Sequence, residues 1–350
     1  MEDGTPYRIY ARIENKLRIP EHHIKSSFYV YQSLVYAKAG TGGASGFFVS
    51  VISPHKRYVY AVTNKHVIGD AQKPTLRLNL KQGGFDYLET YGWTPHKMGD
   101  DISICQIEIP DKFDFECIEY SEFISQLDLE RDKGNLGPGD PTYMIGRFLK
   151  HEGQISNTPI ARFGTIALNP SNDEKIYNSA TKNEDEVFLI ESKSISGYSG
   201  SAVFGYIFHN EDRAKDTPKQ YAIGGPDIPM KFLLGINIGN TPHLEPTRVE
   251  DDDKPFEEWR IHEEGSRQVM YSYNSGIMRI APAWKLLEML NYEEFEDMRK
   301  KEDKKQVDTH KKNDYAVDSI SVDKSVFDKT LKKVSRKTKP SQPGSSKTKT

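Results

Sequence analysis

Short apolar runs broken by turn-forming residues make up most of the chain between residues 27 and 281. Val, Ile, Tyr and Phe dominate the runs, while Gly, Pro, Asn and Asp separate them, which is typical of many short β-strands. The runs do not alternate with helical segments, so a parallel α/β sheet is not expected. We therefore predict an all-β protein of antiparallel sheet, arranged as barrels or a sandwich. The clearest predicted strands are Phe28–Lys38, Gly46–Ile52, Tyr58–Thr63, Thr75–Leu80, Ile102–Ile109, Thr142–Ile145, Ile160–Leu168, Val187–Glu191, Ala202–Phe208, Phe232–Ile238 and Gly276–Ile280.

The predicted strands fall into two sets on either side of a polar segment. Residues 119–135 are charged and only weakly helical, which indicates a linker. The linker separates a first barrel at about 27–118 from a second barrel at about 136–281. Residues 1–26 precede both barrels as an N-terminal extension.

Two stretches in the second set are unusually polar. One covers residues 171–186, and the other covers residues 241–264 and contains the acidic run EDDD. Charge runs of this kind are usually solvated surface loops. The alternative is that they shape a substrate cleft, as loops on a rigid scaffold often do.

After the last predicted strand, the sequence predicts a helix and then a charged tail. Pro282 suits the first turn of a helix, and the apolar residues that follow predict a helix over residues 282–292 that closes the domain of residues 27–292. Residues 293–350 are mostly charged, and residues 332–350 are basic, rich in Ser, Thr and Pro, and free of acidic residues. This composition predicts a charged C-terminal tail that is largely disordered.

Charge and cysteine content indicate the expected cellular location and the expected classes of binding partner. The 350 residues carry a formal net charge of -3, so nucleic acid is not expected as a partner except through the basic C-terminal tail. Cys105 and Cys117 are the only cysteines, and the start MEDG lacks the pattern of a secretory signal, which predicts free thiols and a cytoplasmic location. No apolar stretch approaches the roughly 18 residues of a membrane-spanning helix, so no membrane partner is expected.

Two motifs place a histidine and an acid beside predicted strands. The segment AVTNKHV brings His66 just past a strand end, where its imidazole can face a cleft, although a lone histidine there is more often structural. The segment GDDISI places Asp101 directly before a strand, where a carboxylate can accept a hydrogen bond from a histidine Nδ1–H. Alone, two aspartates before a strand are ordinary turn chemistry, and Asp100 competes for the same role.

A third motif, SISGYSGSA, places Ser199 between Gly197 and Gly200 at the start of a predicted strand. The glycines permit a tight turn that exposes the serine hydroxyl. The same turn can direct the N–H groups of Gly197 and Ser199 toward one point, as an oxyanion hole requires. Such a cluster of Gly and Ser is, by itself, more often a plain loop.

The chain order His66, Asp101, Ser199 resembles the catalytic triad of the trypsin-like peptidases of the chymotrypsin fold, especially the intracellular bacterial type. The resemblance lies in the segments AVTNKH, DDISI and SGYSGSAV and extends over about residues 28–290. It implies two antiparallel six-stranded β-barrels, a serine endopeptidase with a protein or peptide substrate, and no cofactor. Asp101 is preferred to Asp100 because the family's acid precedes an apolar, small, apolar series.

The resemblance also implies a role for each residue of the triad. Ser199 attacks the scissile carbonyl, His66 takes the serine proton and later gives it to the leaving amine, and Asp101 orients His66. The N–H groups of Gly197 and Ser199 form the oxyanion hole.

Substrate contacts are implied at two further places. Gly235, Ile236 and Asn237 resemble the strand whose backbone pairs with an extended substrate, and Lys193 lies where the family often sets its primary pocket, so it could favour an acidic side chain. Tyr198 departs from the secreted members, which have an aspartate there that pairs with a new N-terminus made by cleavage. Zymogen activation of that kind is therefore not expected.

A metal site is not expected from the sequence. The histidines show no spacing of the helix type that binds zinc, and His22 and His23 are interpreted as a polar turn. Cys105 and Cys117, the only cysteines, do not support a structural zinc site.

Two alternatives to a constitutively active protease stay open. A catalytically inactive relative would use the same fold as a peptide-binding or scaffold module, although all three triad positions hold the required residue types. A protease without zymogen chemistry could instead be kept inactive by its loops until a regulatory protein partner arrives.

Overall fold

The computed structural model describes residues 18–126, 129, 136–148, 153–178, 183–192, 197–207, 230–248, 259–263 and 266–318. The chain divides into two compact units, residues 1–297 and residues 298–350. The first unit is mostly β-sheet and contains every strand described below, and it also holds all the predicted catalytic residues.

The first sheet is antiparallel apart from one short parallel pairing, and its strands run in the order β5-β4-β1-β2-β3-β7-β6, with β8 beside β2. Within the described residues no pairing joins its edge strands β5 and β6, so the sheet is open where the sequence predicted a closed barrel. Strand β6 has only two residues, and one is Pro95, which has no N–H to extend a ladder. The strands are β1 (Ser27–Tyr31), β2 (Ala44–Ile52), β3 (Arg57–Thr63), β4 (Thr75–Asn79), β5 (Phe85–Glu89), β6 (Thr94–Pro95), β7 (Ser103–Ile107) and β8 (Ile118–Glu119).

The second sheet closes into a six-stranded antiparallel barrel, as the sequence predicted for this half. Its strands follow the order β13-β10-β9-β14-β15-β17, and the pairing of β13 with β17 closes the ring. Strand β16 pairs with β17 outside the ring. The strands are β9 (Pro141–Gly146), β10 (Ile160–Leu168), β13 (Phe188–Glu191), β14 (Ala202–Ile207), β15 (Met230–Arg248), β16 (Trp259–Glu263) and β17 (Ser266–Pro282).

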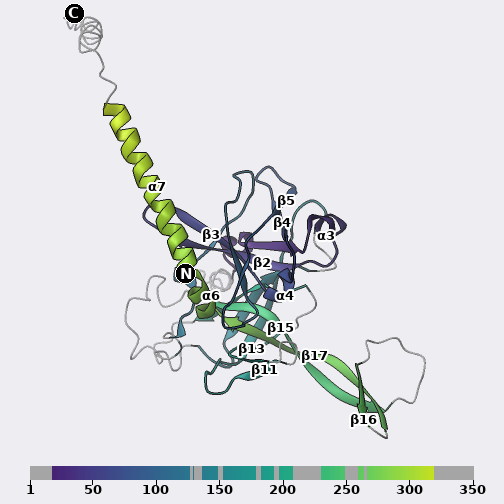
Figure 1. The fold of residues 1–350 in the computed structure, drawn as a ribbon. Helices are drawn as coiled ribbons and strands as arrows, with labels where there is room; N and C mark the ends of the chain where they lie inside the picture. Colours follow the sequence, from purple (N-terminus) through teal and green to yellow (C-terminus); the bar gives the residue numbers. More distant parts are fainter. Residues whose placement is uncertain are drawn as a thin grey trace, which may run out of the picture. The chain divides into compact units, whose positions relative to one another are not determined.

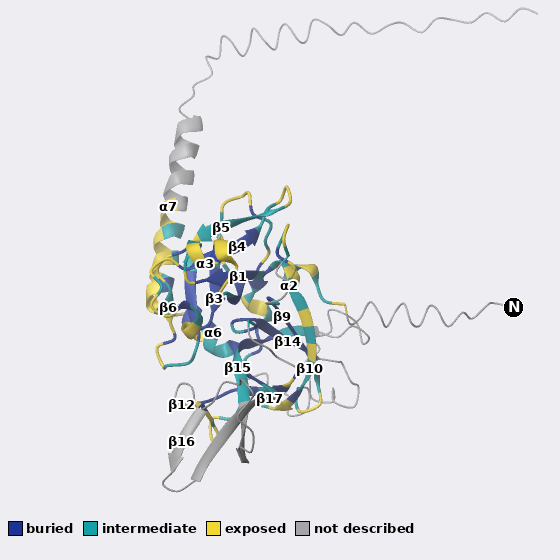
Figure 2. Cartoon of the chain, turned by 90° about the vertical axis from the view of Figure 1, so that its right-hand side faces the viewer, coloured by how far each residue is buried: buried dark blue, intermediate teal, exposed yellow. Residues whose placement is uncertain are grey.

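Strand β2 lies between two hydrophobic clusters and contributes to both. Phe47 and Val49 pack in the larger cluster, which extends into the barrel, while Phe48 points into a smaller cluster with Phe28 and Leu76. Because successive side chains of a strand point to opposite faces, a strand buried on both faces must be apolar throughout. The apolar stretch Phe47–Val49 of β2 thus joins the first sheet to the barrel, and the buried strands form the interior in Figure 2.

One predicted strand is partly helical. The run Phe28–Lys38 was expected to be extended, but β1 ends at Tyr31 and helix α3 (Leu34–Ala39) follows. The Ser33 hydroxyl accepts a hydrogen bond from the Tyr36 N–H at the N-terminus of α3, and Gly40 ends the helix with φ 67°. These two capping residues favour a helical turn over continued strand.

The two polar insertions contain strands as well as loops. Strands β11 (Ile176–Asn178) and β12 (Asn183–Asp185) form a small hairpin within residues 171–186. Strands β15 and β17 continue past the barrel as a long antiparallel pair, and β16 lies beside β17 (Figure 1). The end of β15 and all of β16 fall within residues 241–264. Polar strands of this kind escape a search for apolar runs.

Two helices follow the barrel. Helix α6 (Ala283–Leu290) occupies the segment of the predicted closing helix, and its Leu286, Met289 and Leu290 are buried. Residues 293–350 were expected to be a largely disordered tail, whereas residues 293–318 form helix α7 (Glu293–Asp318). The acidic residues of its first turn suit the positive end of the helix dipole. The rest of the predicted tail lies outside the described residues.

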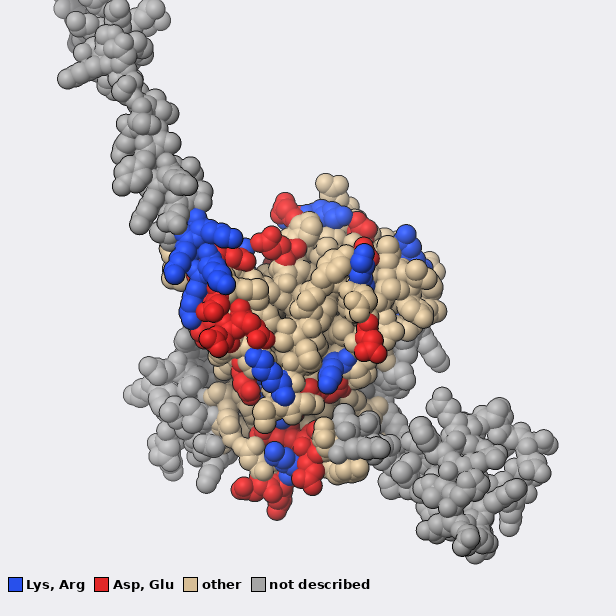
Figure 3. All heavy atoms as spheres, viewed as in Figure 1, with Lys and Arg blue, Asp and Glu red and all other residues tan. Residues whose placement is uncertain are grey.

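Charged side chains of both signs lie on the face shown in Figure 3. On the face in Figure 3, Lys and Arg side chains are interspersed with Asp and Glu over the described residues. Among the described helices, none is both long and apolar enough to cross a membrane.

Candidate active site

His66 and Asp101 are joined by two hydrogen bonds. Strand β3 ends at Thr63, and the short helix α4 (Lys65–Ile68) carries His66 directly afterwards. Asp101 lies just before β7, the strand paired with β3. Its Oδ2 lies 2.5 Å from His66 Nδ1, and its Oδ1 accepts a hydrogen bond of 2.9 Å from the His66 backbone N–H. The pairing of β3 with β7 therefore brings the predicted histidine and acid together.

This contact fixes the imidazole for proton transfer at its other nitrogen. A carboxylate can only accept, so in the neutral imidazole it selects the tautomer with the proton on Nδ1 and the lone pair on Nε2. The Asn64 side chain donates a 2.8 Å hydrogen bond to the Asp101 carbonyl and holds its backbone in place. The Asp101 side chain is only 9% exposed, whereas that of His66 is 51% exposed. The buried acid thus supports a ring whose reactive edge is accessible.

Asp100, the competing acid, is used elsewhere. Its Oδ1 lies 2.5 Å from Lys285 Nζ of α6, and its Oδ2 lies 2.8 Å from His96 Nδ1. Burial alone would raise the pKa of the Asp100 carboxyl, but the contacts with His96 and Lys285 outweigh burial and hold that pKa below its usual value. Asp100 therefore ties α6 to the first sheet and does not contact His66.

Backbone hydrogen bonds from two directions hold the segment that contains Ser199. From the first sheet, the Ser45 N–H of β2 donates to the Ser199 carbonyl at 3.0 Å. From the barrel, the Asn237 side chain donates to the Tyr198 carbonyl at 3.0 Å, and the Gly200 N–H donates to the Asn237 carbonyl at 2.9 Å. The serine is thus fixed where the first sheet meets the barrel.

The Ser45 hydroxyl holds the residue two positions before Ser199. It donates a 2.9 Å hydrogen bond to the Gly197 carbonyl and accepts one of 2.8 Å from the Arg147 N–H at the end of β9. Gly197 has φ 95°, a left-handed conformation that favours glycine. Within the described residues, neither the Gly197 N–H nor the Ser199 N–H has a hydrogen-bond acceptor. These two donors are available to an oxygen of a bound molecule.

His66 and Ser199 line one open pocket of about 360 Å³. Among the described residues no hydrogen bond joins their side chains, and such bonds are often long in an enzyme without substrate. Gly197 also lines this pocket. The full lining is Gln32, Gly42, Gly43, Ala44, His66, Val67, Gly197 and Ser199.

The comparisons with known proteins leave the family open. No family model matches the chain, and no curated protein matches it. The solved structure of Deg5 is similar, with a TM-score of 0.40 and 15% sequence identity, over 68% of this chain and 88% of that one.

The predicted substrate-binding strand is placed differently from expectation. Gly235, Ile236 and Asn237 are buried in β15. Their strand pairs with β14 on one side and with β17 on the other. With both edges occupied at these residues, the backbone has no free groups to pair with an extended substrate. Asn237 serves the site differently, by holding the Tyr198 carbonyl. Lys193 lies outside the described residues, so its predicted substrate contact stays a prediction.

Several residues that hold the candidate site in place belong to no recognisable sequence motif. Ser45 is one of many serines, and Lys285 pairs with Asp100 across 185 residues. Tyr198 is fully buried, and its hydroxyl accepts a 2.9 Å hydrogen bond from Arg162 Nε of β10. The position before Ser199 is therefore filled by a tyrosine anchored to the barrel wall.

Substituting Gly200 by alanine should destabilise the protein and displace Ser199. Gly200 has φ 82°, and an added Cβ would meet the Ser45 carbonyl and the Thr63 hydroxyl well inside van der Waals distance. We expect a loss of about 2–5 kcal/mol in the free energy of unfolding, since a left-handed alanine costs about 1–2 kcal/mol and overpacking adds about 1–3 kcal/mol. Denaturant unfolding measures it.

The matched control is Gly83→Ala. Gly83 has φ 87°, but nothing lies within 4 Å of an added Cβ. This variant should lose only the conformational part, about 1–2 kcal/mol. Equal losses for the two variants would show that packing against Ser45 and Thr63 does not constrain the Ser199 segment.

Proposed function

We propose that this protein is a serine endopeptidase that hydrolyses peptide bonds through Ser199, His66 and Asp101 and an acyl-enzyme intermediate. The observation that carries the proposal is the doubly hydrogen-bonded pair of His66 and Asp101 beside a pocket that Ser199 also lines. A histidine oriented by a buried acid and placed near a serine is the general arrangement of an activated nucleophile.

In the proposed first step, Ser199 Oγ attacks the carbonyl carbon of the scissile bond. The new C–O bond forms as the hydroxyl proton moves to His66 Nε2 and the carbonyl π electrons move to oxygen. Asp101 supports this transfer, because its carboxylate faces the Nδ1–H and stabilises the imidazolium that results.

The next steps return the proton and release the products. The C–N bond breaks as His66 Nε2 gives its proton to the leaving amine, which leaves the acyl group on Ser199 Oγ. Water then attacks the ester carbonyl and passes a proton to Nε2, after which the ester C–O bond breaks and Ser199 regains its proton. Each step leaves Asp101 ionised.

The proposed oxyanion hole consists of the N–H groups of Gly197 and Ser199. Their lack of acceptors among the described residues supports this role, as does the Ser45 hydroxyl that holds the Gly197 carbonyl. Preorganised donors of this kind stabilise the tetrahedral oxyanion without reorganising, and losing one typically lowers kcat by about 100- to 1000-fold.

We also propose that a protein partner gates this activity, so the test uses a native lysate. Added to the lysate, the wild-type protein should generate new protein N-termini that Ser199→Ala does not, since only the wild type can form the acyl-enzyme. Quantitative sequencing of N-terminal peptides measures the difference. Identical N-termini for the two proteins would contradict protease activity. Rapid cleavage of unfolded casein by the purified protein alone would instead contradict the gating.

A further inference from the structure

Three potential metal ligands converge at a place remote in sequence from the proposed triad. His22 and His23 lie on the short helix α2 (Glu21–Lys25), and Glu122 ends the 3-10 turn η1 (Tyr120–Glu122). The Nε2 atoms of His22 and His23 lie 3.0 Å and 2.8 Å from the same oxygen, Glu122 Oε2. All three ligand atoms lie within 4.8 Å of one another.

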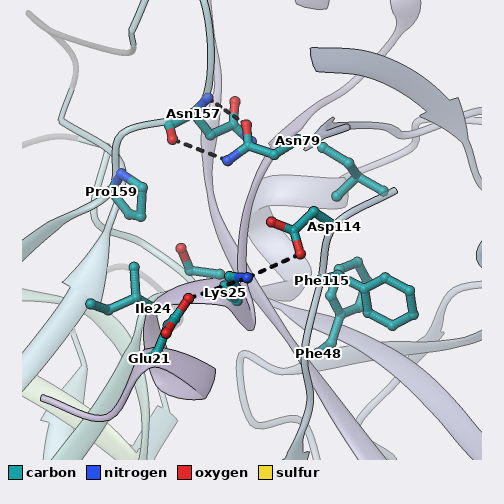
Figure 4. A pocket seen from close by; sticks show the side chains of 11 residues that line it. Glu21, Ile24, Lys25, Phe48, Asn79, Asp114, Phe115, Asn157 and Pro159 are labelled. Carbon is teal, nitrogen blue, oxygen red and sulfur yellow. Dashed lines mark hydrogen bonds and ion pairs between the residues drawn. The ribbon is translucent and has the colours of Figure 1, made fainter. Parts of the chain in front are cut away.

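Helix α2 is anchored by its lysine. Lys25 Nζ lies 3.2 Å from Asp114 and 3.2 Å from Glu21. Figure 4 shows Lys25, Glu21 and Ile24 around a separate pocket. The anchored helix presents His22 and His23 to Glu122.

His23 is fixed as a ligand would be. Its side chain is only 1% exposed, and its ring stacks on Phe204 with centroids 4.0 Å apart. Its Nδ1 lies 2.7 Å from the Tyr143 hydroxyl, which leaves Nε2 as the atom that faces Glu122. An outer hydrogen bond to the far ring nitrogen is the usual way in which proteins orient a metal-binding histidine.

Glu122 presents one oxygen to the imidazoles. Its Oε1 accepts a 2.9 Å hydrogen bond from the Glu119 N–H, so Oε2 is the atom that faces them. The carboxylate and the two imidazoles thus offer one ligand atom each, gathered at one point.

We propose that His22, His23 and Glu122 bind one divalent cation of the zinc class, with water as a further ligand. Two imidazole nitrogens and a carboxylate oxygen form a borderline donor set that suits Zn²⁺ and Co²⁺ better than Mg²⁺ or Ca²⁺. Ligands about 2.0–2.1 Å from a tetrahedral zinc lie roughly 3.3 Å from each other. The present separations of 3.0 Å and 2.8 Å from Glu122 Oε2 would therefore widen by a few tenths of an ångström on binding. The His22 and Glu122 side chains are 41% and 25% exposed, which provides an entry path and room for water.

The cation would act as a structural clamp. It would tie the N-terminal helix α2 to η1, which follows the first sheet, while the Tyr143 contact connects the same cluster to barrel strand β9. Because the three ligands meet only in the folded chain, binding should raise the unfolding temperature. The proposal is independent of the protease activity.

Metal binding can be tested on the full chain after removal of metal with a chelator. We expect calorimetric titration with Zn²⁺ to give one cation per chain at this site, and Co²⁺ to give visible absorption typical of tetrahedral coordination. His22→Ala and Glu122→Gln should each weaken binding at least tenfold and remove the rise in unfolding temperature. His22 is the preferred variant because its side chain is half-exposed, so the fold should survive its loss.

Two other histidines serve as matched controls. His55 lies in the exposed turn between β2 and β3, and His66 belongs to the candidate active site. His55→Ala and His66→Ala should bind Zn²⁺ as the wild type does. The proposal is overturned if the wild type binds no Zn²⁺ at tenfold excess, if His22→Ala binds as tightly as the wild type, or if only His66→Ala loses binding.

Discussion

Replacing Ser199 with alanine should lower kcat for peptide hydrolysis about a million-fold. The hydroxyl oxygen is the proposed nucleophile, and without it no acyl-enzyme forms, so that only binding and the oxyanion donors still act on the substrate. The measurement is steady-state hydrolysis of a substrate identified by N-terminal sequencing. Since the Ser45 N–H bonds to the backbone carbonyl of Ser199, alanine keeps this contact and the fold should be retained.

Ser201→Ala is the matched control for this loss. Ser201 lies in the same segment, but its side chain is fully buried and does not line the pocket with His66. Its loss should leave kcat within the same order of magnitude. If Ser201→Ala abolished hydrolysis and Ser199→Ala did not, the nucleophile would be the wrong serine.

Asp101→Asn should lower kcat about ten-thousand-fold while leaving the fold intact. An amide can offer its N–H groups to Nδ1, which favours the tautomer with the proton on Nε2 and removes the base that Ser199 needs. It also leaves the developing imidazolium without a facing negative charge. The change in kcat, followed beside the unfolding temperature, separates this effect from misfolding.

Asp100→Asn should lower the stability of the protein and leave kcat nearly unchanged, the opposite of the result expected for Asp101→Asn. It removes the charge 2.5 Å from Lys285, whose side chain is only 12% exposed, so we expect about 3 kcal/mol lower stability with little change in kcat for the folded protein. The folded-state pKa of Asp100 is below its usual value, so its stabilising effect is present above the unfolded pKa of about 3.9 and disappears as pH falls through the lower folded value. The stability gap between wild type and variant should therefore shrink below about pH 4. A larger kcat loss for Asp100→Asn than for Asp101→Asn would reverse the roles assigned to the two acids.

The sequence predicted the strands well where burial made them apolar. Strands β2, β3 and β14 lie within a residue or two of their predicted bounds because their side chains are buried on both faces or pack in the barrel. The closure of each sheet was harder to predict, because it depends on which edges pair. The barrel closes through β13 and β17, which are distant in sequence, while β6 in the first sheet is too short to extend the ladder. Polar hairpins carry no apolar signal and escaped prediction.

The candidate site could be predicted in part because chain order and strand context carried the information. His66 and Asp101 each follow or precede a strand of one ladder, so pairing of β3 with β7 was enough to join them. The sequence could not tell that Asp100 is held by Lys285, nor that both edges of β15 are occupied at Gly235. Those facts depend on contacts between distant segments.

The cluster of His22, His23 and Glu122 illustrates the same limit. Two adjacent histidines favour a polar turn when they are considered alone, and the third ligand lies about one hundred residues away. Only the packing of α2 beside η1 brings the carboxylate to both imidazoles. Ligand sets assembled from distant segments have no fixed spacing to search for.

Ser199 is the proposed nucleophile, activated by His66 and Asp101. The most direct measurement of this role is reaction of the full chain with a fluorophosphonate probe, in buffer and in native lysate, followed by mass spectrometry of the modified peptide. We predict modification at Ser199 in the wild type and in Ser201→Ala, a strongly reduced rate in Asp101→Asn, and none in Ser199→Ala. No labelling of the wild type under either condition, or labelling at a different serine, would contradict the account and favour an inactive peptide-binding module.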